Sequence, residues 1–353
     1  MNGVVLTYPH QKAGHCGSGA LRDLMDWADL DWGSAPSEGL VFTLGGALDF
    51  AYLRDHTLQP PVYLVGRGAD MELDLLRRLG AHAELRQTDD PALGWKWVTA
   101  ELDEGRPVMV WADIAELPYL RVRLQMSRHD IVIIGYDDDT QLAHVVDNDR
   151  DNVQTVTYQA LARARASTGF PVPTRHATYI VEWPHRLPPL APVAADALSR
   201  SARTLRHGGG DAIATPAPGG VCGNGLHGVR TFTTDLGHWP DIFDTSGLNL
   251  ALGALAAFIE KAGTGGGLFR HLLARGCAEI AHRTANPHAY AAAEAAQQAA
   301  RAWTALAAAA ASTDNPAQRA TLAAQRAAVL PNLEETLAAA LAAAAHSLGT
   351  PNT

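Results

Sequence analysis

The chain has 353 residues, enough for two domains of ordinary size. Its formal net charge of −9 excludes the electrostatic attraction on which non-specific nucleic-acid binding depends, and no apolar run reaches the ~18 residues of a membrane span. The first residues lack a signal-peptide pattern, and the 3 cysteines are widely spaced, so we expect a cytoplasmic protein without disulfides or a bound metal.

Residues 1–185 combine short helical and strand patterns. In chain order, these predict a helix over 17–28, a strand over 61–65, helices over 71–79 and 98–103, strands over 107–111, 130–136 and 142–146, a helix over 157–167 and a strand over 177–183. Because the strands at 130–136 and 142–146 flank an acidic turn, they predict a β-hairpin. The first half is therefore predicted to be an α+β domain with an antiparallel sheet.

Clustered Pro and Gly over residues 186–228 predict a linker that carries one short helix near 197–206. Residues 229–353 are predicted to form an all-α domain, because apolar residues recur at helical spacing and alanine favours helix. The predicted helices cover 248–261, 268–282, 286–311 and 315–348. This domain could shape a substrate pocket or form a homodimer interface.

The first candidate for chemistry is Cys16, within GHCGSG directly ahead of the first predicted helix. A cysteine at a helix N-terminus meets unpaired N–H groups and the positive end of the dipole, which favour the thiolate. The segment therefore predicts a nucleophile. The alternative is a buried cysteine that acts as a small hydrophobic residue.

A thiolate nucleophile requires a histidine and a group that orients the histidine. His129 opens the first strand of the hairpin, and the second strand leads into Asp147, Asn148 and Asp149. Successive registers place each of these three opposite His129, where Cβ atoms are roughly 5 Å apart. We therefore predict a triad of Cys16, His129 and Asp147, with the orienting residue left open among the three.

Two further acidic residues are weaker candidates for substrate binding. Glu38 lies in a hydrophobic setting ahead of Gly45-Gly46 and could bind an amine, although helix capping or a buried hydrogen bond explains it equally well. Asp113, within WADIAELPY, could line a cleft.

Several segments resemble the butirosin biosynthesis protein H family. They are GHCGSGALRDLM, SEGLVFTLGGALDF, GRPVMVWADIAELPY, HDIVIIGYD with HVVDND, and IEKAGTGGGLFRHLL, which occur in collinear order over nearly the whole chain. The resemblance implies a papain-like N-terminal domain, related to bacteriocin-processing peptidases, and a characteristic helical C-terminal domain. By motif, it implies Cys16 as nucleophile, His129 as base and Asp147 as orienting residue.

The resemblance departs from the family pattern at one position. Papain-like enzymes usually carry an oxyanion-hole glutamine six residues before the cysteine, whereas this chain has His10 there, followed by Gln11. Either side chain could donate to the oxyanion together with the backbone N–H of Cys16.

The namesake of the family is an acyltransferase, which moves an aminoacyl chain from an acyl carrier protein thioester to an amine of an aminoglycoside. The resemblance thus implies a pantetheine thioester donor, a small-molecule amine acceptor and no cofactor beyond the donor's phosphopantetheine. The alternatives are a cyclase, thioesterase or peptidase that uses the same triad, or a non-catalytic protein that binds a carrier-linked intermediate.

Carrier proteins are generally acidic, so docking against a net charge of −9 requires a local basic patch. Two groups of arginines offer one, namely Arg121, Arg123 and Arg128 ahead of His129, and Arg200, Arg203 and Arg206 at helical spacing. The alternative for the second group is an ordinary solvated helix face.

Overall fold

The computed structural model describes residues 3–122, 125–209 and 216–350. The chain divides into two compact units. The first comprises Met1–Pro36 and Glu72–Leu187, and the second comprises Ser37–Met71 and Pro188–Thr353. The chain therefore enters the second unit early, leaves it at the start of a helix and returns after residue 187.

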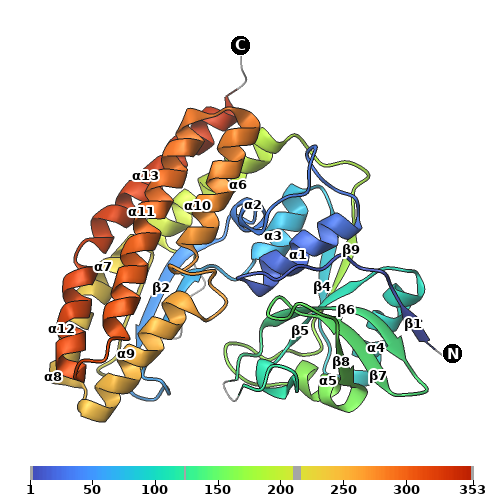
Figure 1. Ribbon diagram of the computed structural model, residues 1–353, viewed down its shortest axis with the longest axis horizontal. Coiled ribbons are helices and arrows are strands. Elements are labelled where there is room, and N and C mark those ends of the chain that lie inside the picture. The colour runs from blue at the N-terminus through green and yellow to red at the C-terminus, as the bar shows by residue number, and fades with distance from the viewer. Residues whose placement is uncertain (1–2, 123–124, 210–215, 351–353) are drawn as a thin grey trace. The chain divides into compact units, whose positions relative to one another are not determined.

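The first unit is built on a seven-stranded antiparallel sheet (Figure 1). Its order is β4 (His82–Arg86), β9 (Thr178–Glu182), β5 (Val108–Ala112), β6 (His129–Asp137), β7 (Leu142–Val146) and β8 (Gln154–Thr157), while β1 (Gly3–Val5) also pairs with β6. Since β6 pairs with β1, β5 and β7, it is the best-anchored strand of the sheet. The predicted α+β class with an antiparallel sheet is confirmed.

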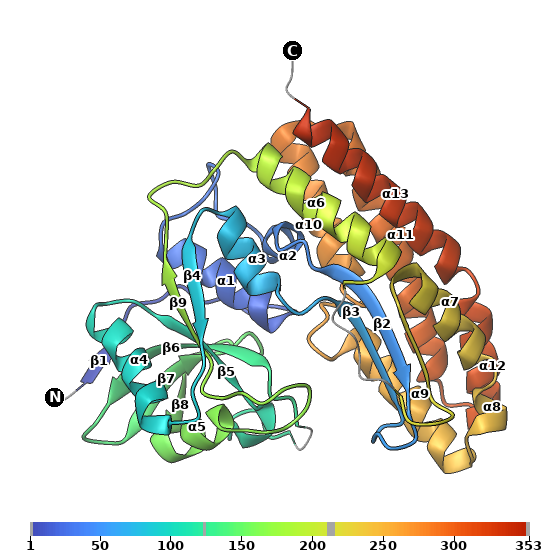
Figure 2. The same cartoon turned by 180° about the vertical axis from the view of Figure 1, so that it is seen from behind.

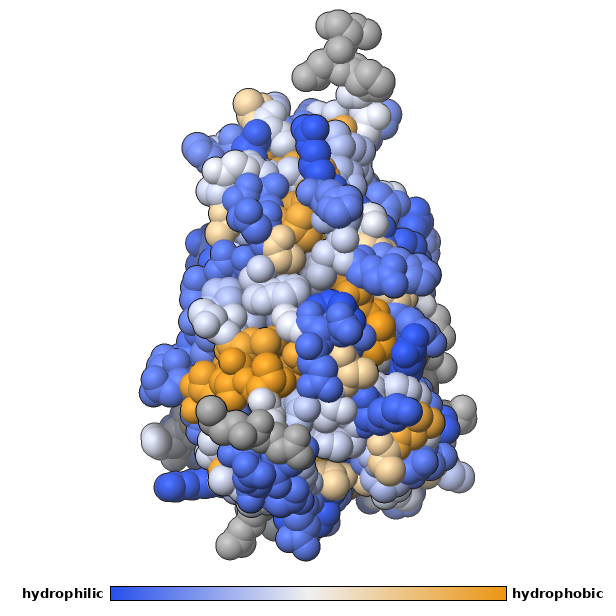
Figure 3. All heavy atoms as spheres, turned by 90° about the vertical axis from the view of Figure 1, so that its right-hand side faces the viewer, coloured by the Kyte–Doolittle hydropathy of each residue, from blue (hydrophilic) through white to orange (hydrophobic). Residues whose placement is uncertain are grey.

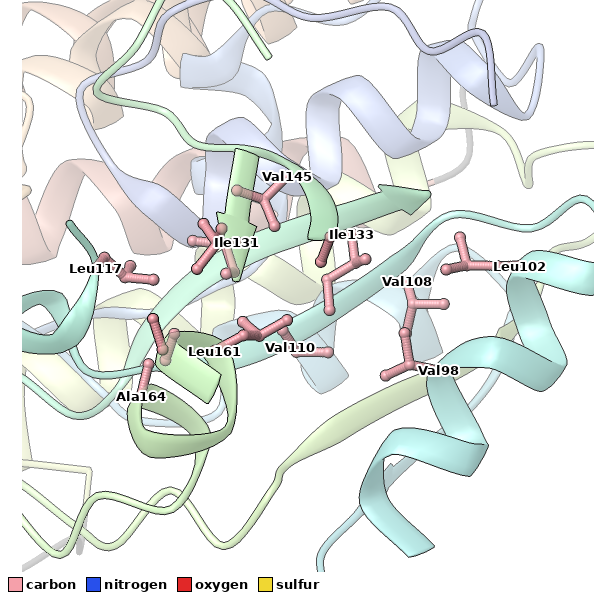
Figure 4. Packing of buried hydrophobic residues seen from close by; sticks show 14 residues of the cluster. Val98, Leu102, Val108, Val110, Leu117, Ile131, Ile133, Val145, Leu161 and Ala164 are labelled. Carbon is pink, nitrogen blue, oxygen red and sulfur yellow. The ribbon is translucent and has the colours of Figure 1, made fainter. Parts of the chain in front are cut away.

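The helices of the first unit are α1 (Cys16–Trp27), α3 (Met71–Arg78), α4 (Pro91–Asp103) and α5 (Tyr158–Arg165), with a 3₁₀ turn η1 (Ile114–Glu116). Apolar side chains from α4, β5, β6, β7 and α5 meet in one buried cluster (Figure 4). Ile131 and Ile133 of β6 are fully buried there, and each contributes about 1.5–3 kcal/mol by burial. This packing holds the strand that begins with His129.

The second unit combines a three-stranded antiparallel sheet with helices (Figure 2). The sheet order is β10 (Val221–Asn224), β2 (Leu48–Arg54) and β3 (Val62–Arg67). The helices are α2 (Glu38–Leu44), α6 (Leu190–His207), α7 (Gly225–Leu236), α8 (Trp239–Ile242), α9 (Thr245–Glu260), α10 (Arg270–Thr284), α11 (Pro287–Ala310), α12 (Pro316–Ala327) and α13 (Leu330–Gly349).

The predicted domain boundaries differ from these units. Residues 37–71, which the prediction placed in the first domain, pack with the helical unit. Phe42 of this segment stacks on Phe269 with ring centroids 5.5 Å apart, and Phe50 stacks on Trp303 at 5.6 Å. Aromatic burial of this kind outweighs proximity in sequence.

The predicted linker over 186–228 is also corrected. It contains the whole of α6, an 18-residue helix, and β10, which pairs with β2. The short helix expected over 197–206 was thus only the second half of a longer one. The described part of residues 229–353 carries only helices, as predicted, whereas the second unit also contains a small sheet because β2, β3 and β10 precede these residues in the chain.

Two helix boundaries were predicted incorrectly. The single helix expected over 315–348 is two helices, α12 and α13, and Pro331 lies in the first turn of α13, where its missing N–H costs nothing. In the first unit, α4 begins at Pro91 rather than near 98, with Asp90 accepting a hydrogen bond from the N–H of Ala92 (2.9 Å).

Within the described ranges, no helix is long and apolar enough to span a bilayer, despite the alanine-rich α11 and α13. The face of the molecule in Figure 3 is largely hydrophilic, with hydrophobic residues gathered in a few separate areas.

Candidate active site

Cys16 is the first residue of α1, and the local sequence explains why the helix begins there. His15 has an extended backbone, and its Nδ1 accepts a hydrogen bond from the backbone N–H of Ser18 (3.1 Å), so His15 caps the helix. Gly19 allows the preceding loop to approach, because a Cβ at this position would lie 2.4 Å from Cβ of Ala13. Cys16 is 9% exposed, at the helix end where the dipole favours an anion.

His129 and Asp147 meet at the open end of the β6–β7 hairpin. Nε2 of His129 donates to Oδ2 of Asp147 (2.9 Å). The observed register is not one of those that place Asp147 or Asn148 directly opposite His129, because residues 138–141 form the turn and a bulge lies between Ile133 and Gly135. Val132 pairs with Val146, and Asp147 directly follows β7. His129 and Asp147 therefore interact diagonally across the hairpin and not as a directly opposed pair.

The electrostatics of these residues are strongly coupled. Burial alone would lower the pKa of His129, but the charge and hydrogen bond of Asp147, together with a side-chain hydrogen bond to Cys16, raise it well above the usual value. Burial would raise the pKa of Asp147, but the charge of His129 and its hydrogen bond outweigh this effect and lower it. Since Nε2 of His129 binds Asp147, the ring nitrogen left for Cys16 is Nδ1.

Asp147 is itself held by two further donors. The hydroxyl of Tyr119 donates to Oδ2 (2.8 Å), and the backbone N–H of Asp149 donates to Oδ1 (3.1 Å). Sequence reasoning quoted Tyr119 as the last residue of GRPVMVWADIAELPY but gave it no role, because nothing in a loop sequence shows that its hydroxyl reaches Asp147.

The other two predicted orienting residues have different partners. Nδ2 of Asn148 donates to the carbonyl of Ala13 (3.1 Å), and the N–H of Ala13 donates to the carbonyl of Asn148 (3.0 Å). These bonds tie the loop before Cys16 to the end of β7. Asp149 forms an ion pair with Arg150 at 2.7 Å. Asp147 is therefore the residue that the structure brings to His129.

A second carboxylate lies beside the thiol. Sγ of Cys16 is 3.8 Å from Oδ2 of Asp130, which is 1% exposed. Arg128 lies close in sequence, where it donates to Oε2 of Glu72 (3.3 Å) and stacks over the ring of Trp111 at 4.7 Å. Sequence reasoning missed Asp130, because alternation along a strand predicts that neighbours of His129 point to the opposite face.

His10 does not provide an oxyanion donor in the structure. Its Nδ1 bonds to Oδ2 of Asp23 (3.0 Å) and its Nε2 to the carbonyl of Arg150 (2.7 Å), which occupies both ring nitrogens. The hydrogen bond with Asp23 is the main cause that raises the pKa of His10. The side chain of Gln11 is exposed and has no hydrogen bond among the described residues.

The backbone offers donors that the side chains do not. The N–H groups of Cys16 and Gly17 lie in the first turn of α1 and donate to no partner among the described residues. Such N–H groups are the usual donors to an oxyanion at a helix N-terminus. The prediction included the N–H of Cys16 but not that of Gly17.

The two weaker candidates have structural roles. Asp113 is 0% exposed, so it does not line a cleft. Its Oδ1 accepts the N–H groups of Ala115 (3.0 Å) and Met126 (3.2 Å), and its Oδ2 accepts the hydroxyl of Ser167 (2.5 Å). Three donors to one buried carboxylate anchor the loop that follows β5.

Glu38 belongs to the second unit, in the first turn of α2. It lies 4.0 Å from Arg275 of the same unit, and Ser37 is the residue that caps the helix. Among the described residues, no group of three or more His, Cys, Asp or Glu side chains is placed to hold a metal ion.

The fold and the site together define an α+β protein in which a helix-capped cysteine lies beside a histidine–aspartate pair of an antiparallel sheet. The family model described as "Butirosin biosynthesis protein H, N-terminal" matches residues 15–148, and that described as "Domain of unknown function (DUF4872)" matches residues 159–341, just over half of the chain. The chain therefore belongs to the family with this butirosin biosynthesis protein H-like two-domain arrangement, as the resemblance predicted. Among curated proteins, no sequence matches it significantly.

Proposed function

We propose that the protein is a cysteine-dependent acyltransferase of natural-product biosynthesis. It takes an acyl or aminoacyl group from a carrier-bound pantetheine thioester, holds it on Cys16 and passes it to a small-molecule amine. The observation that carries this proposal is the hydrogen bond between His129 and Asp147 at 2.9 Å, in the same unit as Cys16 at the N-terminus of α1. Cys16 is also one of the groups that raise the pKa of His129. The family membership supports a biosynthetic reaction.

In the first half-reaction, the thiolate of Cys16 attacks the thioester carbonyl. The tetrahedral intermediate then expels the pantetheine thiolate, which takes the proton from the His129 imidazolium. One thioester replaces another, so the bond energies nearly cancel and the protein contributes chiefly by positioning and by excluding water. The N–H groups of Cys16 and Gly17 support the negative oxygen of the intermediate.

In the second half-reaction, the acceptor amine attacks the acyl-Cys16 carbonyl. His129 takes the amine proton, and the Cys16 thiolate leaves as the amide forms. The interaction with Cys16 is one of the causes that raise the pKa of His129. Acylation removes this contribution, so the pKa of His129 falls in the acyl-enzyme, and the neutral imidazole can then act as a base.

The chemistry requires no metal or redox cofactor beyond the phosphopantetheine of the donor. Cys16, Cys222 and Cys277 are all free thiols, which suits the reducing conditions of the cytoplasm. We therefore place the reaction there, with a carrier protein or a pantetheine thioester as donor.

The first test is intact-protein mass spectrometry after incubation with a panel of acyl-pantetheine thioesters, without any amine. We expect the wild type to gain the mass of one acyl group and the Cys16→Ala variant to gain none. Cys222→Ala is the matched control, because it removes an exposed free thiol of the second unit and should leave acylation unchanged. Acylation of Cys16→Ala to the wild-type extent would exclude this nucleophile.

The second test distinguishes transfer from hydrolysis and from mere binding. The isolated acyl-enzyme is mixed with a panel of amines, and the products are followed by mass spectrometry. Amide formation that depends on the amine supports the transferase. Release of free acid or a cyclic product at the same rate with and without amine would indicate a thioesterase, peptidase or cyclase instead. Absence of any acyl-enzyme across the panel would favour a binding protein.

A further inference from the structure

A polar depression of about 560 Å³ lies in the first unit beside the candidate triad. It is lined by Pro118, Tyr119, Arg121, Arg150, Gln154 and Thr155. These residues come from the loop after η1, from the segment between β7 and β8, and from the start of β8 itself. Among the described residues that line it, two carry guanidinium groups and none carries a carboxylate, which makes the depression a candidate anion site.

The two arginines differ in how much of their hydrogen-bonding capacity is used. Arg121 is exposed and, among the described residues, makes no hydrogen bond or ion pair. Arg150 donates through Nη2 to the carbonyl of Tyr119 (2.7 Å) and through Nη1 to Asp149 (2.7 Å). Its Nε has no partner among the described residues, so the pair retains donors for a ligand. Arg123, part of the predicted basic patch, lies outside the described residues.

The depression is connected to the triad by hydrogen bonds. Tyr119 lines it, and the hydroxyl of Tyr119 donates to the same Oδ2 of Asp147 that accepts Nε2 of His129. The guanidinium of Arg150 also lies over the ring of Tyr119, with Cζ 5.9 Å from the ring centroid. Tyr119, which lines the depression, is therefore linked to the ring of His129 by two hydrogen bonds that meet at Asp147.

We propose that this depression binds the phosphate of the pantetheine arm through Arg121 and Arg150. The inference rests on the proposed function and specifies how the donor is recognised. A phosphate offers several acceptor oxygens to the planar guanidinium groups, whereas the remainder of the arm is uncharged. Binding one end of the donor near the triad keeps the thioester at the other end close to Cys16 and supplies part of its affinity.

The decisive comparison uses two soluble donors that differ only in the phosphate, acyl-4′-phosphopantetheine and acyl-pantetheine. For the wild type, we expect the second-order rate constant of Cys16 acylation to be about tenfold higher with the phosphate, as charge-assisted hydrogen bonds of this kind predict. In Arg121→Gln we expect this ratio to fall to about twofold. The ratio cancels any general loss of folded or active protein.

Arg186→Gln is the matched control, because Arg186 is an exposed arginine of the same unit that lies outside the depression. We expect its ratio to equal that of the wild type. A second readout needs no catalysis, namely calorimetric titration of Cys16→Ala with 4′-phosphopantetheine, pantetheine and inorganic phosphate. We expect the phosphate-bearing arm to bind more tightly than pantetheine, and the difference to be lost in Cys16→Ala with Arg121→Gln.

The outcomes separate this inference from the proposed function. If Cys16 is acylated equally fast by both donors and Arg121→Gln changes nothing, the phosphate site is refuted and the acyltransferase stands. If Arg121→Gln slows only carrier-bound donors and leaves the ratio for the free donors unchanged, Arg121 binds the acidic carrier surface, which also overturns the proposal. If Cys16 is acylated by neither donor while phosphopantetheine binds, the proposed function fails first.

Discussion

His129 holds its position and its charge through two partners. Asp147 binds Nε2 and favours the imidazolium, while a side-chain hydrogen bond with Cys16 also contributes to the raised pKa of His129. Burial opposes charge on His129 and on Asp147, so the imidazolium is stable only while Asp147 is charged. The positive charge of His129 therefore depends on Asp147 remaining ionised.

Replacing Asp147 by asparagine tests this dependence. Because Asp147 raises the pKa of His129, the Asp147→Asn change lowers it, and His129 then loses its positive charge at a lower pH. At neutral pH, we expect alkylation of Cys16 by iodoacetamide to slow by about tenfold or more, the cost of one charge-assisted hydrogen bond. The measurement is the alkylation rate from about pH 5 to about pH 10, a range that spans the ordinary pKa values of histidine and cysteine.

Asp149→Asn provides the control for that profile. It removes a carboxylate two residues away that is exposed and pairs with Arg150 rather than with His129. We expect its alkylation profile to follow the wild type. Superimposable profiles for Asp147→Asn and the wild type would show that Asp147 does not set the charge of His129.

The carboxylate of Asp130 has an electrostatic effect on the thiol of Cys16 that is opposite to the effect of a positively charged His129. Its Oδ2 accepts a hydrogen bond from Sγ of Cys16 at 3.8 Å, and two negative charges at such a distance in a buried site repel each other. Asp130→Asn removes this repulsion, so we expect iodoacetamide to alkylate Cys16 several-fold faster near neutral pH. Chemical denaturation of the same variant measures the accompanying loss of stability. A slower alkylation in a folded Asp130→Asn protein would mean that the carboxylate assists the nucleophile instead.

At the scale of elements, the second unit depends on a close crossing of α2 and α10. Gly276 of α10 faces Gly39 of α2, and a Cβ on Gly276 would lie 2.1 Å from the carbonyl oxygen of Gly39 and from Oγ1 of Thr43. No Cβ occurs at such a distance from backbone, so one helix would have to move away from the other.

Gly276→Ala is therefore expected to destabilise the protein by about 3 kcal/mol or more, since overpacking against backbone cannot be relieved by a rotamer change. Gly253→Ala in α9 is the matched control, because a Cβ there meets no atom within 4 Å. Alanine in a helix is favoured over glycine by about 1 kcal/mol, so this variant should become slightly more stable. Urea denaturation of the two variants should give shifts of opposite sign. Equal shifts would show that α2 and α10 are not in close contact.

Helices and strands with a strong local sequence pattern could be predicted. Strands that form only because they pair with another strand could not. The helix after Cys16 and the hairpin of β6 and β7 have clear periodicity, so their existence and type followed from the sequence. By contrast, β10 reads Val-Cys-Gly-Asn, with little strand preference of its own, and exists because it pairs with β2.

The candidate site shows the same division. Cys16, His129 and Asp147 could be proposed together, because their residue types, their order and one hairpin limit the options. Tyr119 and Asp130 complete the site through contacts with Asp147 and Cys16, residues distant in sequence, which no local periodic pattern predicts. Tertiary packing, rather than motif, sets these contacts.

At the scale of the whole molecule, the chain path decides which fragments can fold. Residues 37–71 leave the first unit and contribute α2, β2 and β3 to the second. In a fragment that ends at residue 187, Phe42 and Phe50 lose their stacking partners Phe269 and Trp303. Their exposure costs about 2 kcal/mol each and leaves a hydrophobic surface.

We therefore expect a fragment of residues 1–187 to aggregate, whereas residues 1–36 joined to 72–187 by a flexible Gly/Ser linker should fold as a monomer. The linked protein retains the seven-stranded sheet, the apolar cluster of β5 and β6 and the complete triad. Size-exclusion chromatography and amide hydrogen exchange compare the two, and iodoacetamide alkylation of Cys16 reports whether the site is assembled. A soluble, well-protected fragment 1–187, together with an unfolded linked protein, would show that residues 37–71 are needed by the first unit itself.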